Sequence, residues 1–285
     1  MSPIVFDKPG RKVRLDEISA DPPKGMTRER AERRFVPLGK ELFDLQDAMY
    51  GAKVSSVLVV LQGRDTAGKD GSIKHVAGCL NPRGVIVTAF GVPTLEERQH
   101  DFLWRVHRHA PRLGDFSIFN RSHYEDVLVV RVHGLAPKTV WNERFGHIRD
   151  FEELLAEHGT IVLKYFLHVT REEQEKRLRE REVSPETAWK LNPNDWKERD
   201  HWDGYTRAYE DAISKTAVKH APWTIVPANA KWYRNFVIAE SIVEALRKRR
   251  RNWEDTLEEM GRAGRAEIEA YREQIAAAKG AKKKG

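Results

Sequence analysis

The sequence is poor in cysteine and contains no long apolar run. Cys79 is the only cysteine among 285 residues, which excludes a disulfide within the chain and suits a reducing compartment. No apolar stretch approaches the roughly 18 residues that indicate a membrane span. The first ten residues lack the apolar segment of a signal peptide. We therefore expect a cytoplasmic protein with no membrane partner, in which Cys79 packs in the core.

The central part of the chain lacks an excess of either charge. The net charge is +7, but residues 36–246 hold 29 Lys and Arg against 30 Asp and Glu. The excess lies at the ends, because residues 1–35 hold nine cations against six anions and residues 247–285 hold twelve against seven. Nucleic acid is therefore not expected as the main partner. A polyanion site in the centre must depend on the placement of a few cations.

Three regions are expected along the chain, whose length suits one α/β domain with appendages. Residues 1–35 are polar with little periodicity, and we interpret them as an N-terminal arm. Residues 36–246 form the domain, which opens with an amphipathic helix. Residues 247–285 are expected to form a weakly packed basic helix with a frayed basic tip. Apolar residues at helical spacing mark the two helices: Leu38, Leu42, Leu45 and Met49, then Trp253, Leu257, Met260, Ile268, Tyr271 and Ile275.

Five short runs in the central region have the β-branched and aromatic composition of strands. Helical patterns separate them, which predicts a parallel sheet covered by helices on both faces. The runs are 57–61, 85–90, 116–119, 160–169 and 223–226. The fold class expected is therefore α/β, a three-layer sandwich around a five-stranded parallel sheet.

The residues after the first of these strands have the layout of a phosphate-binding P-loop, or Walker A motif. Gly63, Gly68 and Lys69 follow the pattern Gly-x4-Gly-Lys between an apolar strand and a helix start. Glycine lets backbone N–H groups approach phosphate oxygens, and the lysine and the helix N-terminus add positive charge. Asp70 stands where a Ser or Thr usually binds magnesium. The candidate phosphate ligands of this segment are Gly63, Arg64, Ala67, Gly68, Lys69, Asp70, Gly71 and Ser72.

Asp65 is a carboxylate within this loop. It would repel a bound phosphate unless a cation lay between the two groups. Asp65 therefore indicates a magnesium ion that bridges its carboxylate and the phosphate oxygens. The alternative is an Asp that only forms the turn.

A second polar cluster follows the third strand, at residues 119–126. The carboxyl ends of parallel strands face a common crevice, so Arg121 is expected to clamp a phosphate with its planar guanidinium. The alternative for Arg121 is a structural salt bridge. Asn120 occupies the place where P-loop enzymes commonly have a magnesium-associated aspartate. Glu125 and Asp126 are candidates either for the acceptor side of the site or for solvated helix residues.

Four blocks, in the right order, resemble the polyphosphate kinase type-2 family over about residues 36–246. The blocks are 63–72, 120–133, 164–169 and 196–200. Within that family the chain is similar to the class III branch, which phosphorylates both AMP and ADP. Two residues indicate this branch: Asp70 after the P-loop lysine, and Asn120 in place of an aspartate.

The resemblance implies a P-loop kinase-like fold with a helical lid, and phosphoryl transfer between inorganic polyphosphate and AMP, ADP and ATP. Guanine nucleotides are further candidate substrates. The implied cofactor is Mg²⁺, for which Mn²⁺ can substitute, and the implied assembly is a homodimer or homotetramer. The catalytic positions that carry over are Asp65, Lys69 and Arg121. The metal positions are Asp65 and Asn120, and the acceptor-side positions are Asn120, Arg121, Glu125 and Asp126.

Residues 171–207 are charge-dense and lie where nucleotide kinases of this architecture carry a mobile lid. Arg177 and Arg181 are four residues apart, so they share one helix face. A row of cations on one face would suit a linear polyanion. The alternative is a helix with internal ion pairs. Lys74 and Arg131 are weaker candidates for the same polyphosphate channel.

The predicted mechanism needs no general base, because the terminal phosphate of AMP or ADP is already anionic. Magnesium, the lysine and the arginines would offset the repulsion between two polyanions during an in-line transfer. Lid closure would exclude water. Two alternatives are an ATP-dependent P-loop kinase of a nucleoside monophosphate or small molecule, and a non-catalytic polyanion- or nucleic-acid-binding protein that uses its basic termini.

Overall fold

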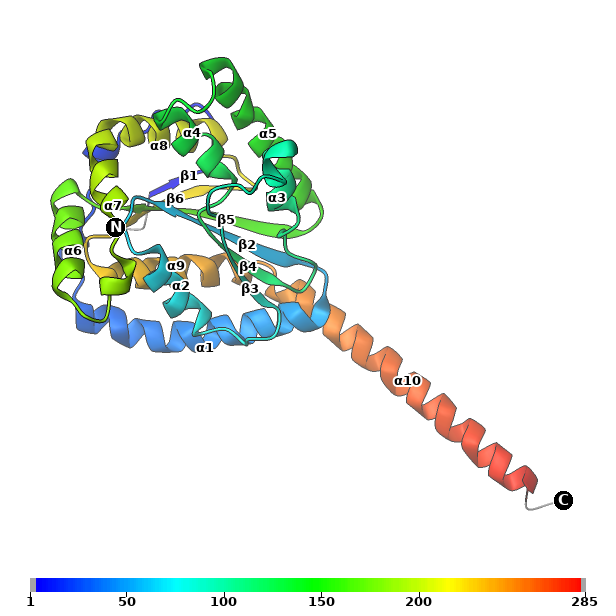
Figure 1. The fold of residues 1–285 in the computed structure, drawn as a ribbon. Helices are drawn as coiled ribbons and strands as arrows, with labels where there is room; N and C mark the ends of the chain where they lie inside the picture. Colours follow the sequence, from blue (N-terminus) through cyan, green and yellow to red (C-terminus); the bar gives the residue numbers. More distant parts are fainter. Residues whose placement is uncertain (1–3, 283–285) are drawn as a thin grey trace.

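The computed structural model describes residues 4–282, with side chains up to residue 279. A sheet lies between two layers of helices, and a long C-terminal helix leaves the body (Figure 1). Within the described residues the strands are β1 (Ile4–Phe6), β2 (Ser56–Gly63), β3 (Val85–Ala89), β4 (Phe116–Asn120), β5 (Thr160–His168) and β6 (Trp223–Pro227). The α-helices are α1 (Arg28–Ala52), α2 (Lys69–Ala77), α3 (Trp104–His107), α4 (Val129–Val132), α5 (Lys138–Glu157), α6 (Arg171–Val183), α7 (Pro193–Lys197), α8 (Trp202–Thr216), α9 (Lys231–Arg247) and α10 (Arg250–Lys282).

The sheet is mixed, so the prediction of a five-stranded parallel sheet was wrong. The described strands form one six-stranded sheet in the order β1-β6-β5-β2-β4-β3. The five predicted strands are all present, and they are parallel to one another. The sixth strand, β1, pairs antiparallel with β6 at the edge of the sheet, with Ile4 opposite Ile225. With only three residues, β1 is too short for an alternating pattern to mark it.

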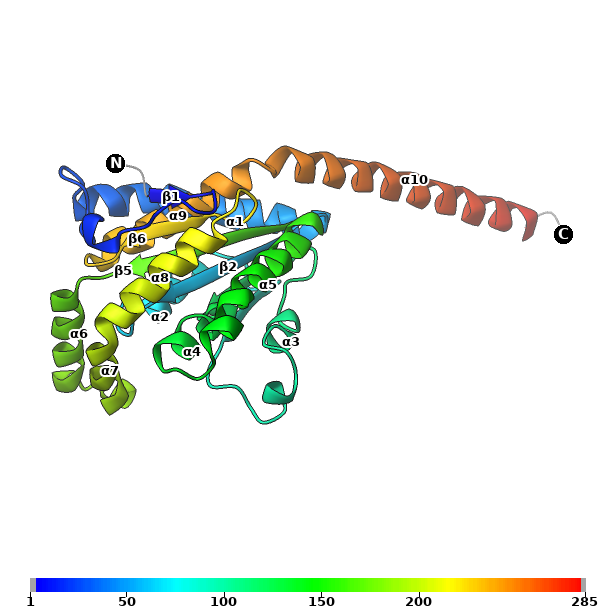
Figure 2. The same ribbon diagram turned by 90° about the horizontal axis from the view of Figure 1, so that it is seen from above.

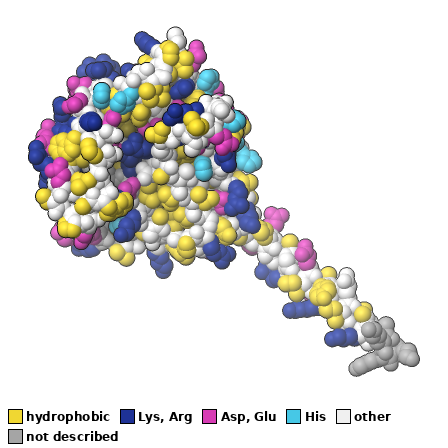
Figure 3. Space-filling model, viewed as in Figure 1, with side chains coloured by type: hydrophobic (Ala, Val, Ile, Leu, Met, Phe, Trp, Pro, Cys, Tyr) yellow, Lys and Arg dark blue, Asp and Glu magenta, His cyan; other side chains and the backbone are white. Residues whose placement is uncertain are grey.

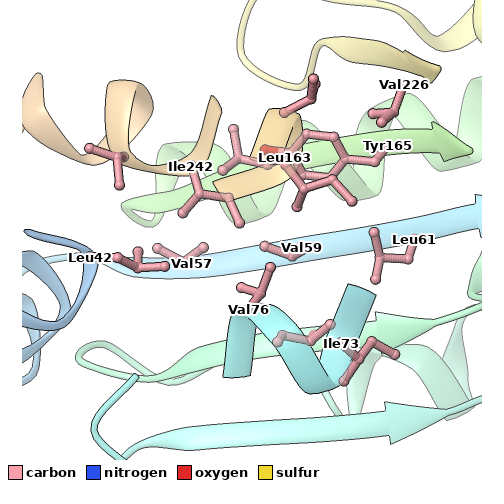
Figure 4. Close-up of a cluster of buried hydrophobic side chains, with 14 of the residues drawn as sticks. Leu42, Val57, Val59, Leu61, Ile73, Val76, Leu163, Tyr165, Val226 and Ile242 are labelled. Atoms are coloured by element: carbon pink, nitrogen blue, oxygen red, sulfur yellow. The ribbon is translucent and has the colours of Figure 1, made fainter. Parts of the chain in front are cut away.

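One core lies between the sheet and the layer formed by α1, α2 and α9 (Figure 4). Val57, Val59 and Leu61 alternate along β2 and point into this core, because successive side chains of a strand face opposite sides. They are buried there together with Leu42 of α1 and Ile242 of α9. The predicted amphipathic helix is therefore confirmed, although α1 begins at Arg28, within the region interpreted as an arm.

A second core lies on the opposite face of the sheet, under α4, α5 and α8. Leu58 and Val60 of β2 belong to it, so β2 is buried on both faces, as a central parallel strand is expected to be. Phe6, Val13 and Leu15 from the first 35 residues are buried in the same core. The N-terminal region therefore contributes to the packing of the body.

The predicted C-terminal helix is confirmed as α10, and it projects away from the body (Figure 2). Its first turn is anchored by Trp253, which is fully buried and donates its indole N–H to Ser55 Oγ at 3.1 Å. The end of the predicted basic tip, residues 283–285, lies outside the described residues. In the part of the chain that is described, no helix is both long and apolar enough to cross a membrane.

Candidate phosphate-binding site

The P-loop begins where β2 ends, in the middle of the sheet. β2 lies between β5 and β4, so the loop and the residues after β4 reach the same edge. Thr66 and Gly68 have positive φ angles of 61° and 101°, which bend the chain sharply before α2 begins at Lys69. A Cβ at Gly68 would lie 1.7 Å from Arg234 Nη1. A larger residue at this position would be strained by the φ of 101° and would displace the Arg234 guanidinium, so glycine is strongly favoured there.

Lys69 is directed back over its own loop. Its ammonium donates to the carbonyl oxygens of Gly63 at 2.7 Å and Arg64 at 3.2 Å. Burial, and then the nearby charge of Arg121, hold the pKa of Lys69 below its ordinary value. The lysine is thus held at the mouth of the loop, where a phosphate oxygen would find an immobilised cation at short range.

Arg121 links the end of β4 to the P-loop. Its Nη2 donates to Asp65 Oδ1 at 2.7 Å, and its Nη1 donates to Glu125 Oε2 at 3.3 Å. Burial alone would lower the pKa of Arg121, but the charges of Glu125 and Asp65 raise it above its ordinary value. The guanidinium therefore stays cationic. Arg121 therefore forms the salt bridge that was the alternative prediction for it. It also lines the cleft described below.

The two residues that depart from the usual motif contact each other. Asn120 Nδ2 donates to Asp70 Oδ1 at 2.8 Å. Lys190, from the segment after α6, donates to Asp70 Oδ2 at 2.6 Å. This hydrogen bond from Lys190 is the main reason that the pKa of Asp70 lies below its ordinary value, and Asn120 adds to it. Asp70 thus connects the start of α2 to both β4 and the predicted lid.

The predicted lid helix α6 is attached to the P-loop by hydrogen bonds. The guanidinium of Arg177 is buried and donates to the carbonyl oxygens of Thr66 at 3.0 Å and Ala228 at 2.6 Å. It also pairs with Glu173, one turn earlier, at 2.9 Å. Arg181 lies on the same face, as its spacing predicted, and donates to Asp195 Oδ2 at 2.7 Å. The two arginines are therefore held by lid and loop groups on the wall of a cleft.

A cleft of about 720 Å³ separates the P-loop from the lid. Cations from four separate parts of the chain line it, which suits a ligand with several negative charges. The predicted site residues on its wall are Asp65, Gly68, Lys69, Asp70, Gly71, Asn120, Arg121, Arg177 and Arg181. The cleft-lining cations that the sequence analysis missed are Lys190, Lys231 and Arg234.

Lys231 and Arg234 lie at the start of α9, directly after β6. Arg234 Nη1 donates to the carbonyl oxygen of Ala67 at 3.1 Å. Burial, with a smaller contribution from the charge of Arg177, lowers the pKa of Arg234 to about 10. Both residues could have been identified from the sequence, because they follow a predicted parallel strand. Cations in that position are expected at the ligand edge of the sheet.

A smaller cavity of about 30 Å³ lies beside the cleft, and Asp65 and Arg121 line both spaces. Gly63, Arg64 and Glu125 line it as well. The Arg64 guanidinium stacks on the ring of Trp202 at 3.8 Å and donates to Thr206 Oγ1 at 2.5 Å. Burial lowers the pKa of Arg64 to about 10. Its side chain ties the P-loop to α8, so only its backbone remains for a phosphate in the main cleft.

The other predicted residues lie outside both spaces. Ser72 is buried and donates to Asn235 Oδ1 at 3.4 Å, and Ala67 is buried below the loop. Lys74 is exposed on the outer side of α2. Asp126 Oδ1 accepts from Arg144 at 3.2 Å, and Arg131 donates to Asp211 at 2.6 Å. The structure does not bring these side chains to the cleft.

A buried polar network supports the segment that carries Arg121. Lys164 of β5 is fully buried and donates to Glu152 Oε2 at 2.6 Å and to Tyr124 Oη at 3.0 Å. His123 lies 3.2 Å from Glu152 Oε1. The charge of Lys164 holds the pKa of Glu152 below its ordinary value in spite of complete burial. The network anchors the turn after β4 to the core of the sheet.

The donor groups at the cleft suit a hard divalent cation. Among the described residues, no three or more His, Cys, Asp and Glu side chains gather as a metal-binding group. Asp65, Asp70 and Asn120 nevertheless present carboxylate and amide groups at the cleft wall. Mg²⁺ is commonly bound by one or two carboxylates, with water and substrate phosphates completing its shell. These residues therefore fit a magnesium ion that is shared with a phosphate ligand.

A P-loop after the central strand, a cationic cleft and a helical lid define a P-loop phosphotransferase of the nucleotide-kinase architecture. The model of the family "Polyphosphate kinase 2" matches residues 25–254. The chain therefore belongs to the polyphosphate kinase 2 family.

Curated relatives and a solved structure give the same result. An AMP/ADP-polyphosphate phosphotransferase of Meiothermus ruber is 49% identical over 219 residues, which cover 77% of this chain and 82% of the relative. An ADP-polyphosphate phosphotransferase of Rhodopseudomonas palustris is 38% identical over 248 residues, which cover 83% and 84%. The crystal structure of polyphosphate kinase 2 from Arthrobacter aurescens superimposes with a TM-score of 0.80 at 37% identity, over 86% of this chain and 92% of that chain.

Proposed function

We propose that this protein transfers phosphoryl groups between inorganic polyphosphate and adenine nucleotides, and that it converts both AMP to ADP and ADP to ATP. The observation that carries the proposal is the cleft, in which cations from the P-loop, β4, the lid and α9 face one another. Similarity to a relative named for AMP, ADP and polyphosphate supports the choice of substrates. Guanine nucleotides are proposed as further acceptors.

Within this proposal Lys69 and Arg121 neutralise charge that develops on the transferred phosphoryl group. Both are cations fixed by hydrogen bonds before a ligand enters, at 2.7 Å to Gly63 O and 2.7 Å to Asp65 Oδ1 respectively. Preorganised charges of this kind stabilise a transition state without further rearrangement. Arg177, Arg181 and Lys190 extend the cationic wall along the lid, where a linear polyanion would pass.

We propose Mg²⁺, or Mn²⁺ in its place, as the cofactor, held by Asp65 with Asn120 and Asp70 beside it. The metal would neutralise phosphate oxygens of both substrates during in-line transfer. Asn120 Nδ2 donates to Asp70 at 2.8 Å, which leaves its amide oxygen as the atom able to face a cation. We also propose that the protein forms a homodimer or homotetramer and lies in the cytoplasm, with a lid at about residues 171–207 whose mobile part is residues 184–201.

The test is a comparison of phosphoryl donors. Purified protein with magnesium is given ADP or AMP, with either polyphosphate or ATP as the donor. We expect ATP to form from ADP, and ADP from AMP, only in proportion to added polyphosphate. ATP-dependent phosphorylation of AMP that ignores polyphosphate would instead support the alternative kinase. Chelation of the metal should stop transfer, and Mg²⁺ or Mn²⁺ should restore it.

A further inference from the structure

The backbone of Arg121 is held in an unfavourable conformation. Its φ angle is 62°, in the left-handed region that residues with a Cβ seldom adopt. In the described part of the chain, the other residues with a positive φ, apart from glycines, are Lys53 at the end of α1 and Thr66 in the P-loop. A strained residue persists only where the surrounding structure fixes it. Other groups must therefore hold Arg121 in place.

The turn at Arg121 sets where its guanidinium lies. The backbone N–H of Arg121 donates to the carbonyl oxygen of Leu61 at 3.1 Å, which extends the pairing of β4 with β2 by one residue. The chain then turns, and the guanidinium meets Asp65 of the P-loop. Lys and Arg side chains are visible in the hollow beside the lid (Figure 3). A change in this φ would move one of the cleft-lining cations away from the P-loop.

Ser122 fixes the turn on one side. It is fully buried, and its Oγ accepts hydrogen bonds from Gln62 Nε2 at 3.1 Å and from the backbone N–H of Tyr124 at 3.2 Å. Gln62 is also fully buried, and it immediately precedes Gly63 of the P-loop. The residue next to Arg121 is therefore tied to the strand that carries the P-loop.

Tyr124 fixes the turn on the other side. Its hydroxyl donates to Glu152 Oε1 at 2.8 Å and accepts from Lys164 Nζ at 3.0 Å. Lys164 also donates to Glu152 Oε2 at 2.6 Å and to the carbonyl oxygen of Thr216 at 2.8 Å. His123 lies 3.2 Å from Glu152 Oε1. Glu152 of α5 thus contacts both aromatic residues of the turn, and Lys164 of β5 fixes Glu152.

Stability alone does not account for a charged pair at this place. Apolar residues of similar size often support a fold as well as a buried ion pair does, because the pair loses its hydration. The described residues that line the cleft and the smaller cavity include none of Tyr124, Glu152 and Lys164. A network of directional hydrogen bonds, when every member is satisfied, specifies one arrangement of its groups. Such a network suits the positioning of a neighbouring segment.

We infer that Glu152 and Lys164 act through Tyr124 as positioning residues for Arg121. The inference rests on the proposed function, in which Arg121 stabilises charge on the transferred phosphoryl group. Neither Glu152 nor Lys164 touches the ligand. Their effect on transfer passes through the strained turn, so it depends on the presence of the Arg121 guanidinium.

Tyr124→Phe tests the link with the smallest change, because it removes the hydroxyl and keeps the ring. We expect kcat to fall about 10- to 100-fold, with the KM for ADP within about threefold, since small misplacements of a reacting group are costly. Glu152→Gln/Lys164→Met, which removes both charges together, should act in the same way. Ser56→Ala is the matched control, because Ser56 Oγ lies 3.0 Å from Thr160 Oγ1, buried between β2 and β5 at the opposite end of these strands. Normal kcat in both network variants would overturn the inference.

A double-mutant cycle separates positioning from a general effect on the fold. In an Arg121→Ala background, Tyr124→Phe should lower kcat by less than twofold further, because the group that it positions is already absent. Full multiplication of the two losses would show that Tyr124 acts by another route, and it would overturn the inference.

Amide hydrogen exchange tests the same link without any assay of transfer. In Tyr124→Phe, exchange in peptides that cover residues 120–124 should accelerate at least tenfold, whereas Ser56→Ala should leave it unchanged. Unchanged exchange in Tyr124→Phe would overturn the inference even in an enzyme that uses polyphosphate. Failure of the proposed function is recognised separately, by the comparison of phosphoryl donors in the unaltered protein.

Discussion

Lys69 shows at the scale of one residue how the site is prepared. Its ammonium lies 2.7 Å from Gly63 O and 3.2 Å from Arg64 O, and burial, followed by repulsion from Arg121, lowers its pKa. A phosphate ligand would relieve that repulsion. A bound phosphate therefore stabilises this ammonium more than it would stabilise an exposed one, because the buried ammonium is already desolvated.

We predict that Lys69→Ala lowers phosphoryl transfer by about 10²- to 10³-fold, the usual cost of one preorganised charge-stabilising donor. The fold should persist, because the ammonium makes its hydrogen bonds to carbonyl oxygens of its own loop. Initial rates with polyphosphate and ADP measure the loss, and thermal unfolding checks the fold. Lys138→Ala, an exposed lysine at the start of α5, is the control. Near-normal turnover of Lys69→Ala would remove this lysine from the mechanism.

We predict that Asn120→Asp changes the preference between AMP and ADP. Asn120 donates to Asp70 at 2.8 Å, so an aspartate there places two carboxylates in contact and adds a negative charge beside the substrate phosphates. Two neighbouring carboxylates disfavour the ionisation of one of them. The contact with Asp70 is then disturbed, and the negative charge changes next to the phosphates, in whose number AMP and ADP differ. The ratio of kcat/KM for the two acceptors is the measurement. An unchanged ratio counts against this placement of the acceptor.

At the scale of elements, the lid and the P-loop form a single unit. Arg177 and Gln174 of α6 donate to the carbonyl oxygens of Thr66 and Asp65 at 3.0 Å each. Movement of α6 as a whole would break these buried bonds. Between α6 and Trp202, where Arg64 again ties the loop to α8, the chain is joined to the loop chiefly by the pair between Lys190 and Asp70. The moving part of the lid is therefore expected to start after α6.

We predict that Lys190→Ala raises the KM for polyphosphate about 2- to 5-fold with little change in kcat, which corresponds to the roughly 0.5–1 kcal/mol of a partly exposed ion pair. The loss reflects both the cleft-lining charge and the contact with Asp70 at 2.6 Å. Lys197→Ala is the matched control, because Lys197 is exposed on α7 of the same lid. Equal effects of the two variants would contradict a specific role for Lys190.

We predict that acid loosens the lid in two steps. Burial, and then Asp65, raise the pKa of Asp195, so its pair with Arg181 weakens above the ordinary Asp pKa of about 3.9. The pKa of Asp70 is lowered by Lys190. Its contact is therefore complete above that ordinary value and is lost only as pH falls through the lower folded-state pKa. Hydrogen exchange of residues 184–197 measures both steps. Asp195→Asn should abolish the step at higher pH, and Asp70→Asn should abolish the step at lower pH.

At the scale of the whole molecule, the two ends of the chain belong partly to the body. Removal of residues 1–35 would take Phe6, Val13 and Leu15 from a core, and removal of 247–285 would take the fully buried Trp253. Loss of a buried tryptophan side chain alone costs about 3–5 kcal/mol. Such deletions would unfold the protein, so they cannot separate catalysis from binding by the basic termini.

We predict that removal of residues 260–285 leaves transfer per chain within about twofold and leaves thermal stability nearly unchanged, since surface changes away from packed contacts cost little. Trp253 and Leu257, which anchor α10, remain. If transfer and polyanion binding vanished together, a protein that acts through its basic tail would be the better explanation.

The sequence by itself determined the parts whose signal is local. The five parallel strands, the P-loop at Gly63–Lys69, the helical C-terminus and the polar turn after β4 follow from short-range pattern, because backbone preference and burial act between near neighbours. Family resemblance added the substrates. The exact positions of helix starts and the three-residue β1 were missed, since β1 exists only through its pairing with β6.

The tertiary structure alone decided which cations meet in the cleft. Arg64 stacks on Trp202 and so points away from the cleft. Asp126 pairs with Arg144, and Arg131 pairs with Asp211. Lys190 contacts Asp70, which lies 120 positions earlier in the chain. The local sequence around an arginine or lysine does not distinguish a residue that lines the cleft from one that is paired elsewhere. Its role depends on the carbonyl or carboxylate that folding places within about 3 Å of it, and no short-range pattern in the sequence encodes that distance.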